Sequence, residues 1–272
     1  MFKDIKIVYI IMYNLNIIPE TYQTTLPYPF IILEDFLENN FALKIQQEIL
    51  NINTDEWDRY DNPFEKKYTL RNKNKLPENT QTLFDILTST NFLQKISDIV
   101  GEELINDPTK NWWGIHKYDN GDKLDIHSDA GIHPKTGDKK HVTLGIYLSL
   151  NWNDSNGGHL ELWDGDSVTN DNAKLTKQII KILPSFNKMI LFNNTNNAWH
   201  GNPYPVNCEE NSKRIFLTIS YLSKNHKNPY DNYRKKAFFI KHPNEEENKQ
   251  KDAIRLLRAD ESKCKTIYKF KL

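Results

Sequence analysis

The chain has 272 residues and a mass of 32.1 kDa, and its 36 basic residues balance its 36 acidic residues at a net charge of zero. We therefore expect no nucleic-acid partner, because proteins that bind a duplex usually carry an excess of basic charge. With 38% hydrophobic residues, the composition is that of an ordinary globular protein, long enough to bury one sizeable core.

The two cysteines, Cys208 and Cys264, are too few for a disulfide framework and lie in no Cys-x-x-Cys motif. We therefore expect a reducing, cytoplasmic compartment. The apolar run from Ile7 to Tyr13 is too short to span a bilayer, and Asp4 makes it a poor signal peptide. We expect no membrane association, and either a strand or a poorly ordered leader within residues 1–25.

The segment that follows is predicted to be mainly helical. Residues Phe30 to Leu33 form an apolar run typical of a short strand. From Glu34 to Leu50, apolar residues recur at the spacing of an amphipathic helix, and a second such pattern extends from Leu83 to Val100. The polar residues 51–80 between these two patterns are predicted to be a loop.

From Trp112 onward the pattern changes to short runs rich in β-branched and aromatic residues, separated by turn residues. Such runs are typical of an antiparallel sandwich or barrel. We therefore predict an α+β, mainly β domain over residues 26–223, with the helices on one side of the sheet. The charged residues 224–272 would form a C-terminal extension, with a helix over 245–258 and a late strand at Ile267–Tyr268. The predicted strands are Trp113–Tyr118, Val142–Leu150, His159–Trp163, Gln178–Leu183, Met189–Phe192 and Arg214–Leu222.

Three residues of this region are candidate metal ligands. His127 and Asp129 are two positions apart, and on a strand such residues point to the same face. His200, just beyond a predicted strand, could supply a third ligand. Two histidines and one carboxylate are the ligand set of non-haem Fe(II) oxygenases, which leaves positions open for O2 and a bidentate cosubstrate.

The His-x-Asp motif alone is weak evidence, because it occurs by chance in many proteins. Other metal sites fit less well, since the sequence has no His-Glu-x-x-His zinc motif, no cysteine cluster and no Asp-rich calcium loop.

Several motifs in consistent order strengthen the hypothesis. Tyr118 and Gly121 precede His127-Ser128-Asp129, and Tyr147-Leu148-Ser149, Asn151-Trp152 and Gly157-Gly158 follow before the strand Ile182–Phe192. Together they resemble the prolyl-hydroxylase-like branch of the 2-oxoglutarate/Fe(II) oxygenases, over roughly Trp113 to Leu222. The resemblance implies a double-stranded β-helix (jelly-roll) core and a dioxygenase that decarboxylates 2-oxoglutarate to succinate and hydroxylates a C–H bond. It also implies Fe(II) as metal, 2-oxoglutarate and O2 as cosubstrates, and ascorbate as an optional reductant.

The same resemblance assigns residues to the cosubstrate. Arg214, at the start of a predicted strand, would bind the distal carboxylate of 2-oxoglutarate through its planar fork of donors. Tyr147 matches the tyrosine that shares this carboxylate, and Thr143 lies on the same strand face. Tyr118 matches a further pocket tyrosine, although a core aromatic explains it equally well. Lys213 is the rival of Arg214, for which a solvated strand end is the alternative.

The sequence departs from the pattern of many prolyl hydroxylases at two positions, since Leu124 and Ser149 stand where those proteins have tyrosine and asparagine. Our leading hypothesis is hydroxylation of a prolyl residue in a protein, and the alternative is a small molecule such as a free amino acid, a sugar or a natural-product intermediate. A non-catalytic binding module would lack a ligand or the basic residue, and none is missing. A cupin-type isomerase or zinc hydrolase would need a further ligand or a general base. His133, in a polar loop, is expected at the surface.

Overall fold

The structure, a computed structural model, describes residues 12–169, 172–225 and 230–263. Its helices are α2 (Pro19–Gln23), α3 (Asn39–Leu50), α4 (Glu78–Thr88), α5 (Thr90–Val100) and α6 (Lys249–Ala259). Its strands are β1 (Phe30–Leu33), β2 (Trp57–Asn62), β3 (Glu65–Leu70), β4 (Trp113–Tyr118), β5 (Lys123–Ser128), β6 (Lys139–Tyr147), β7 (Leu160–Gly165), β8 (Leu175–Ile182), β9 (Lys188–Asn193), β10 (Trp199–Asn202), β11 (Arg214–Ser223) and β12 (Phe238–Phe239).

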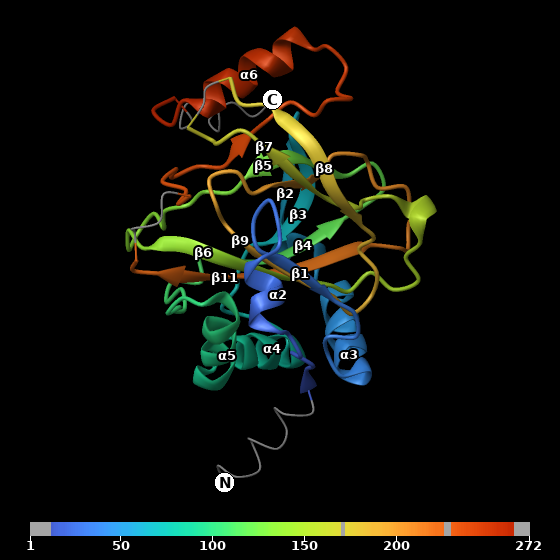
Figure 1. Cartoon of the computed structure of the whole chain (residues 1–272). Coiled ribbons are helices and arrows are strands. Elements are labelled where there is room, and N and C mark those ends of the chain that lie inside the picture. The colour runs from blue at the N-terminus through green and yellow to red at the C-terminus, as the bar shows by residue number, and fades with distance from the viewer. Residues whose placement is uncertain (1–11, 170–171, 226–229, 264–272) are drawn as a thin grey trace.

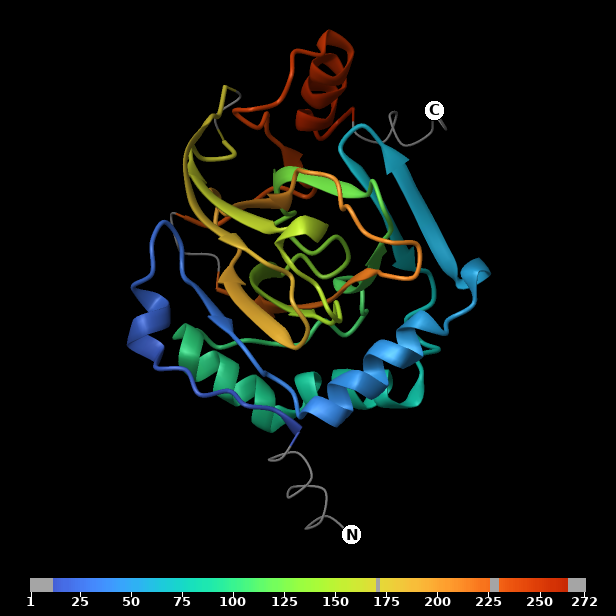
Figure 2. The ribbon, with the colours of Figure 1, turned by 90° about the vertical axis from the view of Figure 1, so that its right-hand side faces the viewer.

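These strands form one curled antiparallel sheet (Figures 1 and 2). The main path runs β1-β9-β6-β11-β4-β3-β5-β10-β7-β8, while β2 pairs with β3 and β12 pairs with β5. Apart from the pairs β3–β4 and β7–β8, neighbours in this path are not consecutive strands in the sequence, so the path brings the middle and the end of the chain together. The mainly β, jelly-roll class predicted from the sequence is confirmed.

Helices α3, α4 and α5 lie together on one side of the sheet, whereas α6 lies at the opposite end of the molecule (Figure 1). The apolar faces of α3, α4 and α5 pack against the outer face of the sheet and form the largest hydrophobic cluster with it. The helices thereby cover the face of the curled sheet that would otherwise be exposed to water. Members of this cluster include Phe41, Ile45, Leu83, Leu87, Phe92, Ile96, Leu144, Leu191, Leu217 and Ile219.

The prediction of a loop over residues 51–80 is wrong. The segment contains the hairpin of β2 and β3, and β3 also pairs with β4 and β5. Strand β2 is exposed along most of its length, so its residues lack the alternation of apolar and polar side chains by which a strand is recognised. In Figure 2 this hairpin stands along one flank of the curled sheet.

The single helix predicted from Leu83 to Val100 is two helices. Ser89 has extended backbone, and its hydroxyl accepts a hydrogen bond from the backbone N–H of Phe92, so it ends α4 and caps α5. The apolar residues of both helices pack in the same cluster as the sheet. Their spacing in the sequence therefore resembles that of one continuous helix and did not reveal the break.

The other predicted strands after Trp113 are confirmed with shifted ends. His200 lies within its own strand, β10, instead of beyond β9. In the C-terminal extension, α6 begins at Lys249 and overlaps the predicted helix. The predicted strand Ile267–Tyr268 lies outside the described residues. The same holds for most of the N-terminal apolar run, Ile7 to Ile11. Within the described ranges, no helix is long and apolar enough to cross a membrane.

Candidate metal and cosubstrate site

The two histidines of the proposed metal site lie directly opposite each other on neighbouring strands. His127 on β5 is the register partner of His200 on β10, and their ring centroids are 4.5 Å apart. Opposed residues of an antiparallel pair are close enough to share a ligand. The topology of the sheet therefore joins two histidines that are distant in sequence.

Asp129 follows directly after β5 and completes the group. Its Oδ1 lies 3.2 Å from Nε2 of His127, and its Oδ2 lies 3.8 Å from Nε2 of His200. Ligand atoms of the three residues all lie within 4.8 Å of one another. This set of two imidazoles and one carboxylate can hold a first-row transition metal and leave coordination positions open.

Hydrogen bonds orient both imidazole rings. Nδ1 of His127 lies 2.9 Å from the carbonyl oxygen of Asp125, and Nδ1 of His200 lies 3.0 Å from that of Ala198. Since only a protonated Nδ1 can donate to a carbonyl, both Nε2 atoms are left as free ligand atoms.

The electrostatics of the group suit metal binding. Burial lowers the pKa of His200 to about 4, so its imidazole is neutral at physiological pH. Burial alone would raise the pKa of Asp129, but Lys140 and the two histidines hold it well below its usual range. The ammonium group of Lys140 lies 2.5 Å from Oδ2 of Asp129. Asp129 is therefore a carboxylate, available as an anionic ligand.

Arg214 is buried at the start of β11, with only 1% of its surface exposed. Its Nε donates to the carbonyl oxygen of Gly158 at 2.8 Å, and its guanidinium lies over the rings of Tyr118 and Tyr147. Gly158 has a positive φ of 63°, and a Cβ there would lie 2.9 Å from Cδ of Arg214. Glycine is needed at this position both for the backbone conformation and for the approach of Arg214.

Two buried polar atoms near Arg214 are unpaired. Nη1 of Arg214 and the hydroxyl of Tyr147 have no hydrogen-bond partner in the described part of the chain. Burial, opposed by the charge of Arg214, raises the pKa of Tyr147 above its usual range, so the hydroxyl keeps its proton and can donate. Unpaired buried donors are costly, and a carboxylate would satisfy both.

One cavity of about 320 Å³ connects these features. It is lined by the three candidate metal ligands, by Arg214 and Tyr147, and by the other residues expected at the cosubstrate, Tyr118 and Thr143. Thr143 lies opposite Ser220, with their hydroxyl oxygens 3.2 Å apart. The structure thus brings together every residue that the sequence proposed for this site.

Lys213, the rival of Arg214, lies elsewhere, since its ammonium pairs with Asp119 at 3.1 Å and does not line the cavity. The expectation for His133 is wrong. It is 1% exposed, its Nε2 lies 3.2 Å from Oδ1 of Asp107, and its ring meets the edge of Trp112. His133 therefore holds the loop from which Trp112 reaches the cavity.

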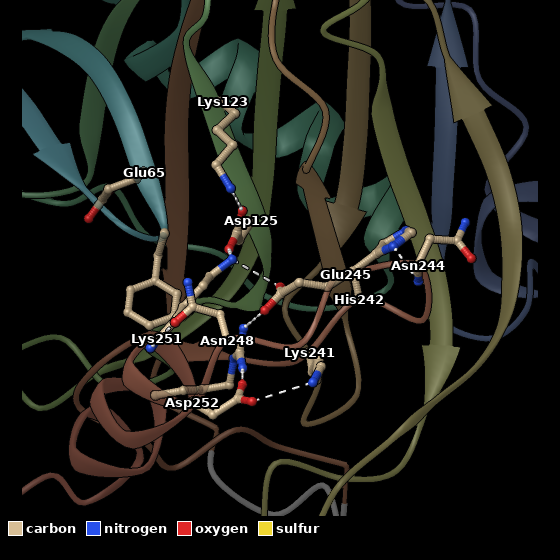
Figure 3. A network of polar contacts seen from close by, with 12 residues as sticks. Glu65, Lys123, Asp125, Lys241, His242, Asn244, Glu245, Asn248, Lys251 and Asp252 are labelled. Carbon is tan, nitrogen blue, oxygen red and sulfur yellow. Dashed lines mark hydrogen bonds and ion pairs between the residues drawn. The ribbon is translucent and has the colours of Figure 1, made fainter.

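The C-terminal segment supports the strand that carries His127. β12 pairs with β5, with Phe239 opposite His127, and the two rings stack at 5.3 Å. Figure 3 shows Lys251 of α6 between Asp125 and Glu245, at 2.5 Å and 3.0 Å, while Lys123 approaches Asp125 from the other side at 2.7 Å. Strand β12 and helix α6 are thus packed onto the β core.

Sequence reasoning missed Phe239, Lys140, Gly158 and Lys251 as neighbours of the site. Gly157-Gly158 had been noted only as one of the ordered motifs of the family, with no contact to Arg214 expected. Phe239 and Lys251 lie in a segment without any motif, and their partners are more than a hundred positions away. The pairing of β12 with β5 reveals the role of Phe239, and the ion pair with Asp125 reveals that of Lys251.

Comparison with protein families shows that residues 113–222 match the model of the 2OG-Fe(II) oxygenase superfamily. Comparison with curated proteins found no match. Among solved structures, a prolyl-4-hydroxylase from Pseudomonas putida is similar, with a TM-score of 0.56 and 13% identity, covering 76% of this chain and 99% of that one.

A prolyl hydroxylase from Trichoplax adhaerens, in complex with a hypoxia-inducible-factor peptide fragment, is similar at a TM-score of 0.56 and 16% identity, covering 82% and 92%. A prolyl 4-hydroxylase from Phytophthora capsici has a TM-score of 0.52 and 17% identity, covering 80% and 70%. At these identities the likeness establishes a shared fold. Residues 113–222 therefore match the 2OG-Fe(II) oxygenase superfamily, and the β core of this chain shares its fold with these prolyl hydroxylases.

Proposed function

We propose that His127, Asp129 and His200 hold Fe(II), and that Arg214 and Tyr147 bind the distal carboxylate of 2-oxoglutarate. The observation that carries this proposal is a single cavity that joins the two-histidine, one-carboxylate group to two unpaired buried donors, within the described residues. Tyr118 and Thr143 would shape the cosubstrate pocket from the same cavity wall.

The chain's own side chains orient the reactants. The backbone carbonyls of Asp125 and Ala198 fix the imidazole rings, and Lys140 holds one oxygen of Asp129. Arg214 and Tyr147 would fix one end of 2-oxoglutarate, so that its other end points along the cavity toward the metal group. Iron bound there, with O2 and 2-oxoglutarate, would supply the oxidation of a C–H bond.

The substrate that we propose is a prolyl residue in a protein. Support comes from the fold, because the three solved structures described above are prolyl hydroxylases and one of them holds a peptide. A free amino acid, a sugar or a natural-product intermediate is the alternative outcome of the experiment.

The test is mass spectrometry of candidate peptides and small molecules after incubation with Fe(II), ascorbate and 2-oxoglutarate. We expect the mass of one oxygen atom to be added to a substrate, together with succinate release that depends on O2. Zn(II) should bind but not support turnover, because zinc has no redox chemistry. Equal succinate release with zinc, or none with iron, would contradict the proposal.

A further inference from the structure

The cavity contains more positive charge than the metal and cosubstrate account for. Its ionised lining comprises four cations and two carboxylates: Lys67, Lys73, Lys140, Arg214, Glu65 and Asp129. Bound Fe(II) is a dication and bound 2-oxoglutarate is a dianion, so the two leave this balance unchanged. An excess of two positive charges therefore remains in the space beside them.

Lys67 and Arg214 do not explain the excess. Lys67 pairs with Glu65 at 3.1 Å, and this ion pair is internally balanced. Arg214 is the proposed partner of 2-oxoglutarate. The uncompensated charges are therefore those of Lys73 and Lys140.

Lys73 lies in the loop between β3 and α4, and its side chain is half-buried. Within the described residues, no carboxylate approaches its ammonium within ion-pair distance. Asp107, the acid whose charge acts on it, is already engaged by His133 and by the backbone N–H of Trp112. Burial lowers the pKa of Lys73, as expected for a cation that lacks a counter-charge.

Lys140 has one acidic partner among the described residues, Asp129 at 2.5 Å. A metal ion would take up the charge of that carboxylate and leave Lys140 unbalanced. Lys140 also lies over the ring of Trp112 at 5.4 Å, beside the cavity. His116 lines the same cavity, and burial and then the charges of Lys67 and Lys73 hold its pKa well below the usual range, so it adds no further charge.

We infer that the substrate carries a carboxylate, which binds to Lys73 and Lys140 beside Trp112. This inference rests on the proposed function and specifies its substrate class. A partly buried cation gains most from a charge-assisted hydrogen bond, and the two lysines are the lining cations left without a partner once iron and 2-oxoglutarate are bound. The carboxylate could be that of a free amino acid, or an Asp or Glu side chain next to the hydroxylated residue of a peptide.

The test uses matched pairs of probes that differ by one charge. Peptides with Glu or Gln at each position within three residues of a proline form one arm, and free L-proline and L-prolinamide form the other. Binding is measured to the full chain loaded with Zn(II) and 2-oxoglutarate, which cannot turn over. The variants are Lys73→Met and, as matched control, Lys75→Met, an exposed lysine of the same loop that does not line the cavity.

We expect one carboxylate probe to bind at least about tenfold more tightly than its amide partner, and the arm in which this occurs identifies the source of the carboxylate. Lys73→Met should abolish the preference while 2-oxoglutarate affinity stays unchanged, and Lys75→Met should retain it. Equal binding of the carboxylate and the amide in every pair, or a preference that survives in Lys73→Met, overturns the inference. Failure of the proposed function is separate, because it appears as absent 2-oxoglutarate binding or absent iron-dependent succinate release.

Discussion

The ring of Phe239 stacks on the imidazole of His127 at a centroid distance of 5.3 Å, and the two residues are register partners across β12 and β5. The guanidinium of Arg258 also lies over the ring of Phe239, at 4.2 Å from the ring centroid. A proposed metal ligand is thus fixed by a ring from the C-terminal segment, which is held in turn by α6.

This relationship predicts that Phe239→Leu weakens metal binding without removing a ligand. Leucine fills much of the same volume but cannot stack on His127, so the imidazole gains rotational freedom. We expect metal affinity to fall by about 10–100-fold, the usual effect of changing a residue that orients a ligand. Calorimetric titration with Mn(II) measures this directly, without turnover.

Phe238→Leu is the matched control, because Phe238 is similarly buried on the same strand but packs against Trp199. It should cost stability and leave metal affinity near the wild-type value. If both variants lose metal affinity equally, β12 acts only by holding the fold together, and the specific role of Phe239 is refuted.

Loss of a ligand should have a larger effect. His200→Ala removes one of the three proposed protein ligands, so metal affinity should fall by more than about 100-fold, beyond the range for supporting residues. Succinate release should cease as well. His159→Ala is the control, since His159 pairs with Asp154 outside the cavity. Wild-type Mn(II) affinity in His200→Ala would remove this residue from the site.

The cosubstrate pocket gives a third prediction. Arg214→Lys keeps the charge but loses the fork of donors, and we expect 2-oxoglutarate to bind more weakly by about 1.5–3 kcal/mol, the range for hydrogen bonds to charged groups. Arg214→Met should cost more, and Mn(II) affinity should survive both changes. Lys213→Met should leave 2-oxoglutarate affinity unchanged. The opposite result, with Lys213 sensitive and Arg214 tolerant, would reverse the assignment.

The sequence was sufficient to predict the β core and the residues grouped in the cavity, because short strands separated by turns and the ordered motifs around His127 and His200 are local signals. It was not sufficient for the β2–β3 hairpin, whose outer strand is exposed and lacks a periodic pattern. Nor could it place Phe239 or Lys251 at the site, since their contacts, a strand pairing and an ion pair, join residues more than a hundred positions apart.

Helix packing offers a prediction about stability and pH. Pro77 precedes α4 and supplies no side-chain cap, and the carboxylate of Glu48 on α3 takes that role. It accepts hydrogen bonds from the backbone N–H groups of Asn79 and Thr80 at 2.9 Å and 2.8 Å, and from both of their side chains. Burial alone would raise the pKa of Glu48, but these hydrogen bonds outweigh it and lower the pKa below 4.5.

Because the folded-state pKa is lower than that of the unfolded chain, the unfolded chain binds more protons between the two values. The stabilisation by Glu48 is therefore fully present above about pH 4.5, and it is lost as the pH falls through the folded-state pKa. We expect Glu48→Gln to lower the free energy of unfolding by about 1 kcal/mol at pH 7, the typical value of a helix cap. Urea unfolding at pH 7 and pH 3.5 should show this difference shrinking at the lower pH, while Glu103→Gln, which alters an exposed carboxylate, shows none at either. A difference that is equal at both pH values would mean that Glu48 acts through its shape and not through its charge.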